Sequence, residues 1–141
     1  MISRLELLLA WYAALAPDNL HRTREFYAVD AHFRDPFNDV RGVASVETIL
    51  RHMFANSDNP HFLIGERIVQ AERAFVTWTF VFTLRGKTHE IAGGTHFHFN
   101  AHGLVTLHRD YWDAAEELLQ KLPLVGGPIR WLRRRFAANV I

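Results

Sequence analysis

The N-terminal part of the chain carries apolar residues at helical spacing. In residues 3–16 they recur at the i, i+3, i+4 positions, which predicts an amphipathic helix. Pro17 predicts the end of that helix, and Asp18 or Asn19 can cap a short second helix over residues 20–28. A third helix is predicted over residues 43–56, and its apolar face consists of Val46, Ile49, Leu50, Met53 and Phe54.

The second half of the chain has the pattern of strands. Four segments rich in aromatic and β-branched residues are separated by short turns. They span residues 61–70, 74–84, 89–99 and 104–112. Because short turns join consecutive strands, we expect an antiparallel meander. Three N-terminal helices followed by such a sheet indicate the α+β class.

Both faces of the predicted sheet carry large side chains. In residues 74–84 one face holds Val76, Trp78, Phe80, Phe82 and Leu84. The opposite face combines Phe75 and Val81 with threonines, whereas a solvated face would be more polar. We therefore expect the helices to cover one face and a second copy of the chain to cover the other, in a homodimer.

The composition narrows the class of protein. With 141 residues, 49% of them hydrophobic, the chain is long enough for one domain with a core or an internal cavity. The formal net charge of +1 gives no electrostatic reason to expect a nucleic-acid partner. No cysteine is present, which excludes disulfides and thiolate chemistry and fits a cytoplasmic location, as we expect here.

Residues 114–141 form an arginine-rich stretch that we interpret as a helical extension of the same domain. The pattern breaks at Pro123 and at residues 126–128, then resumes over residues 129–136. A single short helix anchors weakly to a membrane surface. We therefore expect residues 129–136 to pack onto the domain rather than to contact a membrane.

The segment Phe33-Arg34-Asp35-Pro36-Phe37 places one carboxylate between large apolar side chains. Proline disfavours helical backbone in the residue before it, so a short strand over residues 31–35 is predicted, followed by a turn over residues 37–42. Alternation then puts Asp35 on the same face as Phe33. Asp35 is either a base in an apolar pocket or an acceptor that closes the turn before Pro36.

Strand alternation also predicts a pocket. His108, Asp110 and Trp112 share one face of the last strand, and Thr95 and Phe97 share one face of the strand before it. An apolar pocket with a few convergent polar groups is the usual form of a small-molecule site, so we expect a small hydrophobic ligand. The candidate catalytic residues are Asp35, Tyr12, Asp110 and His108. The candidate substrate-binding residues are Thr95, Phe33, Trp78, Phe97, Trp112 and Phe54.

These residues also have ordinary structural explanations. Tyr12 could be a core tyrosine whose hydroxyl has a hydrogen-bond partner, and Asp110 could form an ion pair with an arginine. His108 could be a buried histidine that only makes structural hydrogen bonds. His96 and His98 share a strand face and suggest a metal site, but no third ligand is evident and alternation points both away from the pocket. We expect no metal and no cofactor.

The order of helices and strands, together with Phe-Arg-Asp-Pro-Phe and the segment His108-Arg109-Asp110-Tyr111-Trp112, resembles the nuclear transport factor 2-like superfamily. Within it, the chain is most similar to the ketosteroid isomerase and SnoaL-like group. The resemblance implies a curved sheet in a cone-shaped, cystatin-like α+β barrel over residues 1–113. Residues 114–141 would be its C-terminal extension.

The resemblance to steroid isomerases also implies roles for single residues. Asp35 matches the general base, Tyr12 the tyrosine that donates to the developing oxyanion, and Trp112 a pocket wall. Thr95 stands where those enzymes carry a protonated aspartate as second donor. A hydroxyl is a weaker donor, so the sequence departs from the family at this position.

Three functions follow from this interpretation. The first is a cofactor-independent isomerase, cyclase or lyase that moves a proton next to a carbonyl of a hydrophobic substrate. The second is a non-catalytic protein that binds an apolar ligand. The third is an epoxide hydrolase-like or dehydratase activity; the epoxide hydrolase mechanism needs an arginine in the cavity, whereas alternation places Arg109 on the opposite face.

Overall fold

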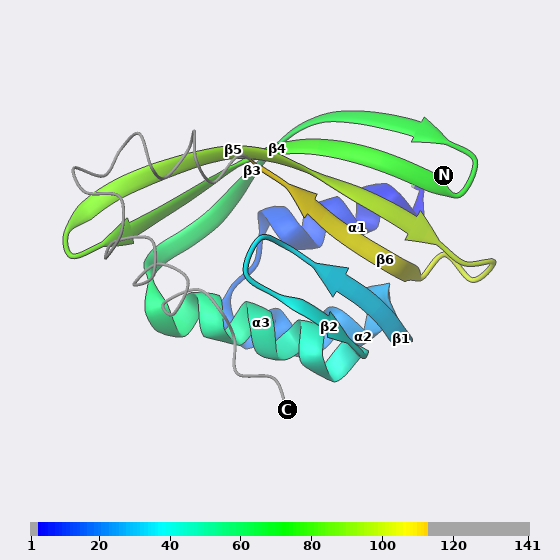
Figure 1. Cartoon of the computed structure of the whole chain (residues 1–141), viewed down its shortest axis with the longest axis horizontal. Coiled ribbons are helices and arrows are strands. Elements are labelled where there is room, and N and C mark those ends of the chain that lie inside the picture. Colours follow the sequence, from blue (N-terminus) through cyan, green and yellow to red (C-terminus); the bar gives the residue numbers. More distant parts are fainter. Residues whose placement is uncertain (1–2, 113–141) are drawn as a thin grey trace.

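The computed structural model describes residues 3–112 and has the predicted α+β architecture (Figure 1). Its helical segments are α1 (Arg4–Ala13), the 3-10 helix η1 (Pro17–Arg22), α2 (Thr23–Phe26) and α3 (Val43–Asn56). Its strands are β1 (Tyr27–Arg34), β2 (Asp39–Arg41), β3 (Asp58–Gln70), β4 (Arg73–Leu84), β5 (Lys87–Phe99) and β6 (Val105–Tyr111). The expected extension over residues 114–141 lies outside the described residues.

The strands form one curved, unclosed sheet in the order β2-β1-β6-β5-β4-β3. The predicted meander is confirmed, because β3, β4, β5 and β6 pair antiparallel in sequence order. The sheet is nevertheless not wholly antiparallel, since β1 lies parallel to β6. This pairing brings the segment before Pro36 beside the last strand, although the two are far apart in sequence.

The region between α1 and α3 differs from the sequence-based prediction. The second helix ends at Phe26 rather than at residue 28, and β1 already begins at Tyr27. The predicted turn over residues 37–42 contains the short strand β2, which pairs with β1. The first difference has a long-range cause, because pairing with β6 extends the backbone from Tyr27 and leaves no local sequence pattern. The second has a local cause: β2 pairs with β1 in a tight hairpin, Arg34 with Asp39, and the turn-forming residues there hide the strand.

The third helix has the predicted bounds, and its start is fixed by Gly42. This residue has φ 99°, a left-handed conformation that glycine adopts without a steric penalty. Its N–H donates to the Ala31 carbonyl at 2.8 Å, which ties the start of α3 to β1. The helix thereby lies across the sheet and contacts β1, β2 and β3.

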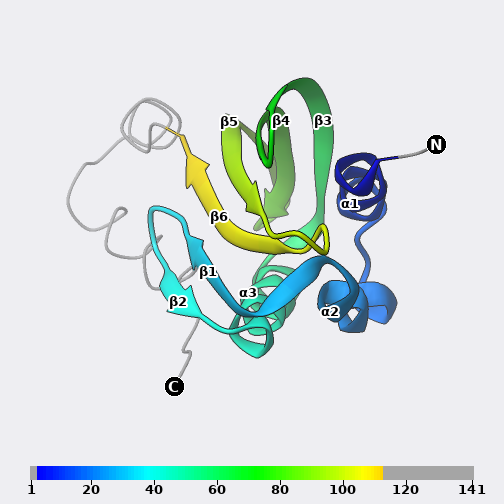
Figure 2. The ribbon, with the colours of Figure 1, turned by 90° about the vertical axis from the view of Figure 1, so that its right-hand side faces the viewer.

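The helices cover the concave face of the sheet, where the main core lies. Figure 2 shows the sheet bending from β3, β4 and β5 toward β1 and β2, with α1 beside β3 and α3 below the strands. Side chains from helices and strands meet there, and the most deeply buried include Leu8, Leu20, Val46, Val76 and Val105. Within residues 3–112, none of the helices has the length and hydrophobicity needed to span a membrane.

Candidate active site

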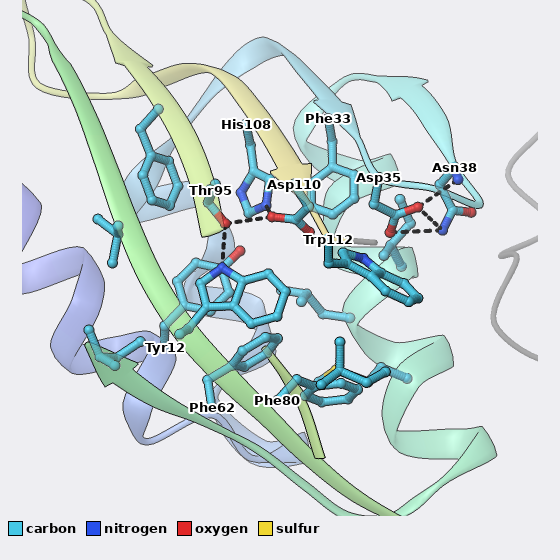
Figure 3. Close-up of a pocket in the computed structure, with 18 of the residues that line it drawn as sticks. Tyr12, Phe33, Asp35, Asn38, Phe62, Phe80, Thr95, His108, Asp110 and Trp112 are labelled. Carbon is cyan, nitrogen blue, oxygen red and sulfur yellow. Dashed lines mark hydrogen bonds and ion pairs between the residues drawn. The ribbon is translucent and has the colours of Figure 1, made fainter. Parts of the chain in front are cut away.

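A cavity of about 110 Å³ lies between the concave face of the sheet, α1 and α3 (Figure 3). Its polar lining residues are Tyr12, Asp35, Asn38, Thr95, His108 and Asp110. The remaining lining is apolar: Leu9, Phe33, Phe37, Ile49, Leu50, Met53, Phe62, Ile64, Val76, Trp78, Phe80, Phe82, Ile91, Phe97 and Trp112. A bound water needs only about 10–15 Å³ of such space, so the cavity has room for a small organic ligand.

The structure brings the four candidate catalytic residues and five of the six candidate wall residues to this cavity. Phe54 is the exception, and its assignment to the wall is corrected. The cavity-lining residues of α3 are Ile49, Leu50 and Met53. Phe54 follows Met53 and is turned about 100° further around the helix, where it packs against the main core instead.

Asp35 follows the last residue of β1, and its carboxylate is held by the turn that comes after it. Oδ1 accepts the backbone N–H groups of Phe37 at 2.8 Å and of Asn38 at 2.7 Å. The Asn38 side-chain amide lies 3.2 Å from both carboxylate oxygens. The turn-closing role weighed for Asp35 is therefore present, and the same carboxylate also lines the cavity.

The environment of Asp35 favours the protonated form of its carboxyl group more than bulk water does. Burial, and next the negative charge of Asp110, raise the pKa of this carboxyl to about 6, against the opposing effect of the hydrogen bonds from the turn. Burial is the larger cause. Asp35 therefore remains mostly ionised at neutral pH while being a better proton acceptor than an ordinary aspartate.

Asp110, on β6, is oriented by two donors. Its Oδ1 accepts the Thr95 hydroxyl at 2.5 Å, and the Thr95 oxygen in turn accepts the Trp78 indole N–H at 2.8 Å. The same Oδ1 lies 2.7 Å from His108 Nε2. All the contacts described for this carboxylate go to Oδ1, so Oδ2 is the oxygen left to face a ligand.

His108 connects Asp110 with two buried tyrosines. Its Nδ1 lies 2.7 Å from the Tyr27 hydroxyl, which lies 2.6 Å from the Tyr12 hydroxyl. The Phe33 ring stacks on the imidazole with centroids 4.3 Å apart, which fixes the plane of the ring. Burial raises the pKa of both tyrosines well above the ordinary value, so both hydroxyls stay protonated.

The protonation state of His108 sets the direction of these hydrogen bonds. With Asp110 ionised, Nε2 must donate to it. A neutral imidazole then accepts at Nδ1 from Tyr27, and Tyr27 accepts from Tyr12. An imidazolium instead donates to Tyr27, which donates to Tyr12, and the Tyr12 hydroxyl hydrogen becomes available to a group in the cavity.

Tyr27 and Asn38 are site residues that sequence reasoning missed. Tyr27 lies within the range predicted as the second helix, and the pairing of β1 with β6 is irregular just after it, so alternation could not place it. Asn38 belonged to a stretch with turn composition. The only signal for Asn38 was its position three residues after Asp35, a spacing typical of a side chain that closes a turn.

The residues behind the metal and epoxide hydrolase hypotheses lie outside the cavity lining. The Arg109 guanidinium lies 4.9 Å from the centroid of the exposed Tyr111 ring, on the other face of β6. The rings of His96 and His98 lie 4.6 Å apart, centroid to centroid. Within residues 3–112, no three His, Cys, Asp or Glu side chains come together as a metal-ligand group.

Residues 8–108 match the model of the SnoaL-like domain. The chain belongs to the SnoaL-like family. A search of curated proteins finds no match. The solved structures it is similar to include a protein with a ketosteroid isomerase-like fold and an NTF2-like protein, and together with the family match they confirm the predicted superfamily.

Three of these structures indicate the range of relatives that share the fold. A hypothetical protein with a ketosteroid isomerase-like fold from Catenulispora acidiphila DSM 44928, in complex with trimethylamine, is 18% identical in sequence; the match covers 82% of this chain and 91% of that one, with a TM-score of 0.71. An NTF2-like protein of unknown function from Burkholderia pseudomallei K96243 is 19% identical; the match covers 88% of this chain and 100% of that one, with a TM-score of 0.73. An LEH-like epoxide hydrolase from M. tuberculosis is 18% identical; the match covers 92% of this chain and 91% of that one, with a TM-score of 0.70.

Proposed function

We propose that this SnoaL-like protein is a cofactor-independent enzyme that moves a proton next to a carbonyl of a hydrophobic substrate. The observation that supports this most is that two carboxylates, Asp35 and Asp110, line one apolar cavity in different hydrogen-bonding environments. Pairs of acids whose surroundings differ in this way are typical of general acid–base sites.

Asp35 is the proposed general base. Its pKa of about 6 keeps it ionised at neutral pH, and the apolar lining spares it from the full hydration that weakens a base in water. It removes a proton from the carbon next to the carbonyl. The electron pair of the broken C–H bond moves to the carbonyl oxygen, which becomes an enolate.

The Tyr12 hydroxyl is the proposed donor to the enolate oxygen. It is free to donate when His108 is protonated, since Tyr27 then donates to Tyr12 rather than accepting from it. Asp110 stabilises that imidazolium through Nε2. The enolate can then take back a proton at another carbon, attack a second carbonyl or expel a leaving group, which gives an isomerase, a cyclase or a lyase.

Hydrogen–deuterium exchange tests the proposal without knowledge of the natural substrate. A panel of flat ketones headed by 1-tetralone is incubated with the protein in D2O, and the loss of the α-proton signal is followed by NMR. We expect wild-type exchange above the solvent rate, and a decrease of about 10²–10⁴-fold in Asp35→Asn. Asp30→Asn, at an exposed acid of the same strand, is the matched control. Exchange that is absent in the wild type, or unchanged in Asp35→Asn, contradicts the proposal.

A non-catalytic ligand-binding protein is the second candidate. It is favoured by the hydrogen bonds that Asp35 accepts from its own turn, which are sufficient to explain an acid at this position. In that case the wild type binds flat ketones but does not accelerate exchange. The epoxide hydrolase mechanism is less well supported, because Arg109 lies outside the cavity lining.

A further inference from the structure

The charges of the cavity wall are unbalanced. Among the described residues that line it, Asp35 and Asp110 are acids, His108 is the one side chain that can carry a positive charge, and no lysine or arginine is present. The groups that shift the pKa of Asp35 include the charge of Asp110 but no cation. The lining therefore holds two carboxylates without a permanent positive partner.

This imbalance persists in both protonation states of His108. With both carboxylates ionised, a neutral imidazole leaves a formal charge of −2 on the lining, and an imidazolium leaves −1. Burying an uncompensated charge away from water is costly. An uncharged ligand that displaces water from the cavity adds to this cost, whereas a cationic ligand removes it.

Aromatic rings line the same cavity as the two acids, and we call Trp78, Trp112, Phe62 and Phe80 the aromatic wall. In Figure 3, Phe62 and Phe80 lie across the cavity from Asp35 and Asp110, and Trp112 lies beside the acids. Phe62 meets Trp78 edge-on, with centroids 5.5 Å apart and planes at 86°, and it stacks on Phe80 at 4.8 Å. Rings at right angles present both a face and an edge to the same cavity. The electron-rich ring faces attract cations.

The aromatic wall is not already paired with a cation of the described chain. The cation–ring contacts between described residues involve Arg4 and Arg22 on Phe26, and Arg109 on Tyr111. Neither Phe26 nor Tyr111 lines the cavity. No arginine in these contacts therefore competes with a cationic ligand for the rings of the wall.

From the two acids and the aromatic wall we infer that the ligand of this cavity carries an ammonium group with apolar substituents. The alkyl groups contact the rings, and the positive charge lies between the rings and the carboxylates. This inference deepens the proposed function, on which it rests for the reaction: the substrate is then a carbonyl compound that also bears an ammonium group. One carboxylate would pair with the ammonium while the other transfers the proton.

A pair of probes of equal shape tests the inference. Choline and 3,3-dimethylbutan-1-ol differ in that a neutral carbon replaces the positively charged nitrogen. Each is titrated into the full chain at pH 8, and binding is followed by NMR. We expect choline to bind at least about tenfold more tightly, because a desolvated cation–ring contact alone supplies this factor. Equal or tighter binding of the alcohol, or no choline binding, overturns the inference.

Two variants connect the preference to the acids of the cavity. Asp35→Asn is expected to lower choline affinity without lowering the affinity for 3,3-dimethylbutan-1-ol, because the alcohol gains nothing from the Asp35 charge. Asp30→Asn, outside the cavity, is expected to change neither. A loss of choline affinity as large in Asp30→Asn as in Asp35→Asn would contradict the inference, since long-range charge would then explain the preference.

The pH dependence supplies a separate readout. Choline affinity should fall as pH decreases through about 6, where Asp35 takes up a proton, while binding of the alcohol should not change in this way. The titratable groups that line the cavity with Asp35 are Asp110, His108 and Tyr12, and protonation of Asp110 or His108 acts in the same direction. Choline affinity that is constant from pH 5 to pH 8 contradicts the inference.

The two proposals fail independently. Ketone exchange without a preference for choline overturns the ammonium ligand and leaves the proton-transfer function. A preference for choline without exchange of any ketone supports the charged ligand and overturns the catalytic proposal.

Discussion

At the scale of the residue, Asp35 combines two roles that are usually separate. Its carboxylate accepts backbone N–H groups like a turn-closing aspartate, which lowers its pKa, and it is buried beside another acid, which raises it. Burial is the stronger effect, so the group ends at a pKa of about 6. The folded protein therefore disfavours the ionised form of Asp35 relative to the unfolded chain.

The first prediction concerns stability. Because the folded-state pKa of Asp35 lies above its unfolded value of about 4, the folded protein binds the proton more tightly. The resulting penalty is absent below about pH 4 and fully present above about pH 6. Asp35→Asn should therefore raise the free energy of unfolding by about 1–3 kcal/mol at pH 8 and by little at pH 4. Urea unfolding at the two pH values measures this, and destabilisation at pH 8 would contradict it.

The second prediction concerns Tyr27, whose hydroxyl connects Tyr12 with His108. Tyr27→Phe removes a partner from both groups in a buried site, which should cost about 1–3 kcal/mol of stability. It should also change the pH profile of the exchange rate, since the protonation state of His108 then no longer controls the Tyr12 hydroxyl. Tyr111→Phe, at a ring that is 46% exposed outside the cavity, is the control. An unaltered pH profile in Tyr27→Phe would exclude the role of Tyr27 in positioning Tyr12.

Strand alternation predicted much of the site at this scale and failed where the strand is irregular. His108 and Asp110 lie on the regular part of β6, and Thr95 on the regular part of β5, so counting by two placed all three at the cavity. Tyr27 precedes an irregularity in the β1–β6 pairing. No count along the sequence could therefore relate its side chain to that of His108.

At the scale of the element, a glycine in β5 makes room for one ring of the aromatic wall on the neighbouring strand β4. Gly93 on β5 pairs with Trp78 on β4, and a Cβ at Gly93 would lie 2.6 Å from the Trp78 ring. The same Cβ would lie 3.0 Å from Trp112 Cβ. The missing side chain of this glycine thus provides the space for the Trp78 indole.

The third prediction follows from this contact. Gly93→Ala forces the Trp78 ring away from β5, which should cost about 1–3 kcal/mol of stability, as overpacking usually does. It should also weaken ligand binding, because the Trp78 indole that donates to Thr95 is moved. Ala92→Ser, at the exposed neighbouring residue, is the control. Unchanged stability and binding in Gly93→Ala would show that the wall adapts freely.

Long elements were predictable from the sequence, and short ones were not. The fourteen residues of α3 carry a full apolar face and a glycine before the first turn, and both bounds were predicted correctly. β2 has only three residues, Asp39, Val40 and Arg41, within a stretch of turn composition. It pairs with β1 in a tight hairpin, and the turn-forming residues around it hide this short strand in the sequence pattern.

At the scale of the whole molecule, the convex face of the sheet remains uncovered by the described helices. We propose that two copies of the chain pair through it, as the strand pattern led us to expect. Ile68 and Leu63 of β3 pair with Phe75 and Thr79 on this face and are 63% and 54% exposed. Exposed apolar side chains on a sheet face are typical of an interface.

The fourth prediction tests this pairing. Light scattering should give a mass of two chains for the wild type, and Ile68→Lys should shift the protein toward one chain, because a lysine is costly to bury without a partner. Val69→Lys is the matched control, since Val69 is 60% exposed but lies on the other face of the same strand. A wild type of single-chain mass, or equal effects of both variants, would contradict the proposed dimer.

Asp35 is a buried carboxylate of raised pKa beside an apolar cavity, and the proposed catalysis depends on this property. Carbon-13 NMR titration of the aspartate carboxyl groups measures this directly and requires no substrate. We expect one carboxyl resonance to titrate at a pKa of about 6 in the wild type and to disappear in Asp35→Asn. An Asp35 resonance that titrates at the ordinary value near 4 or below would contradict the account.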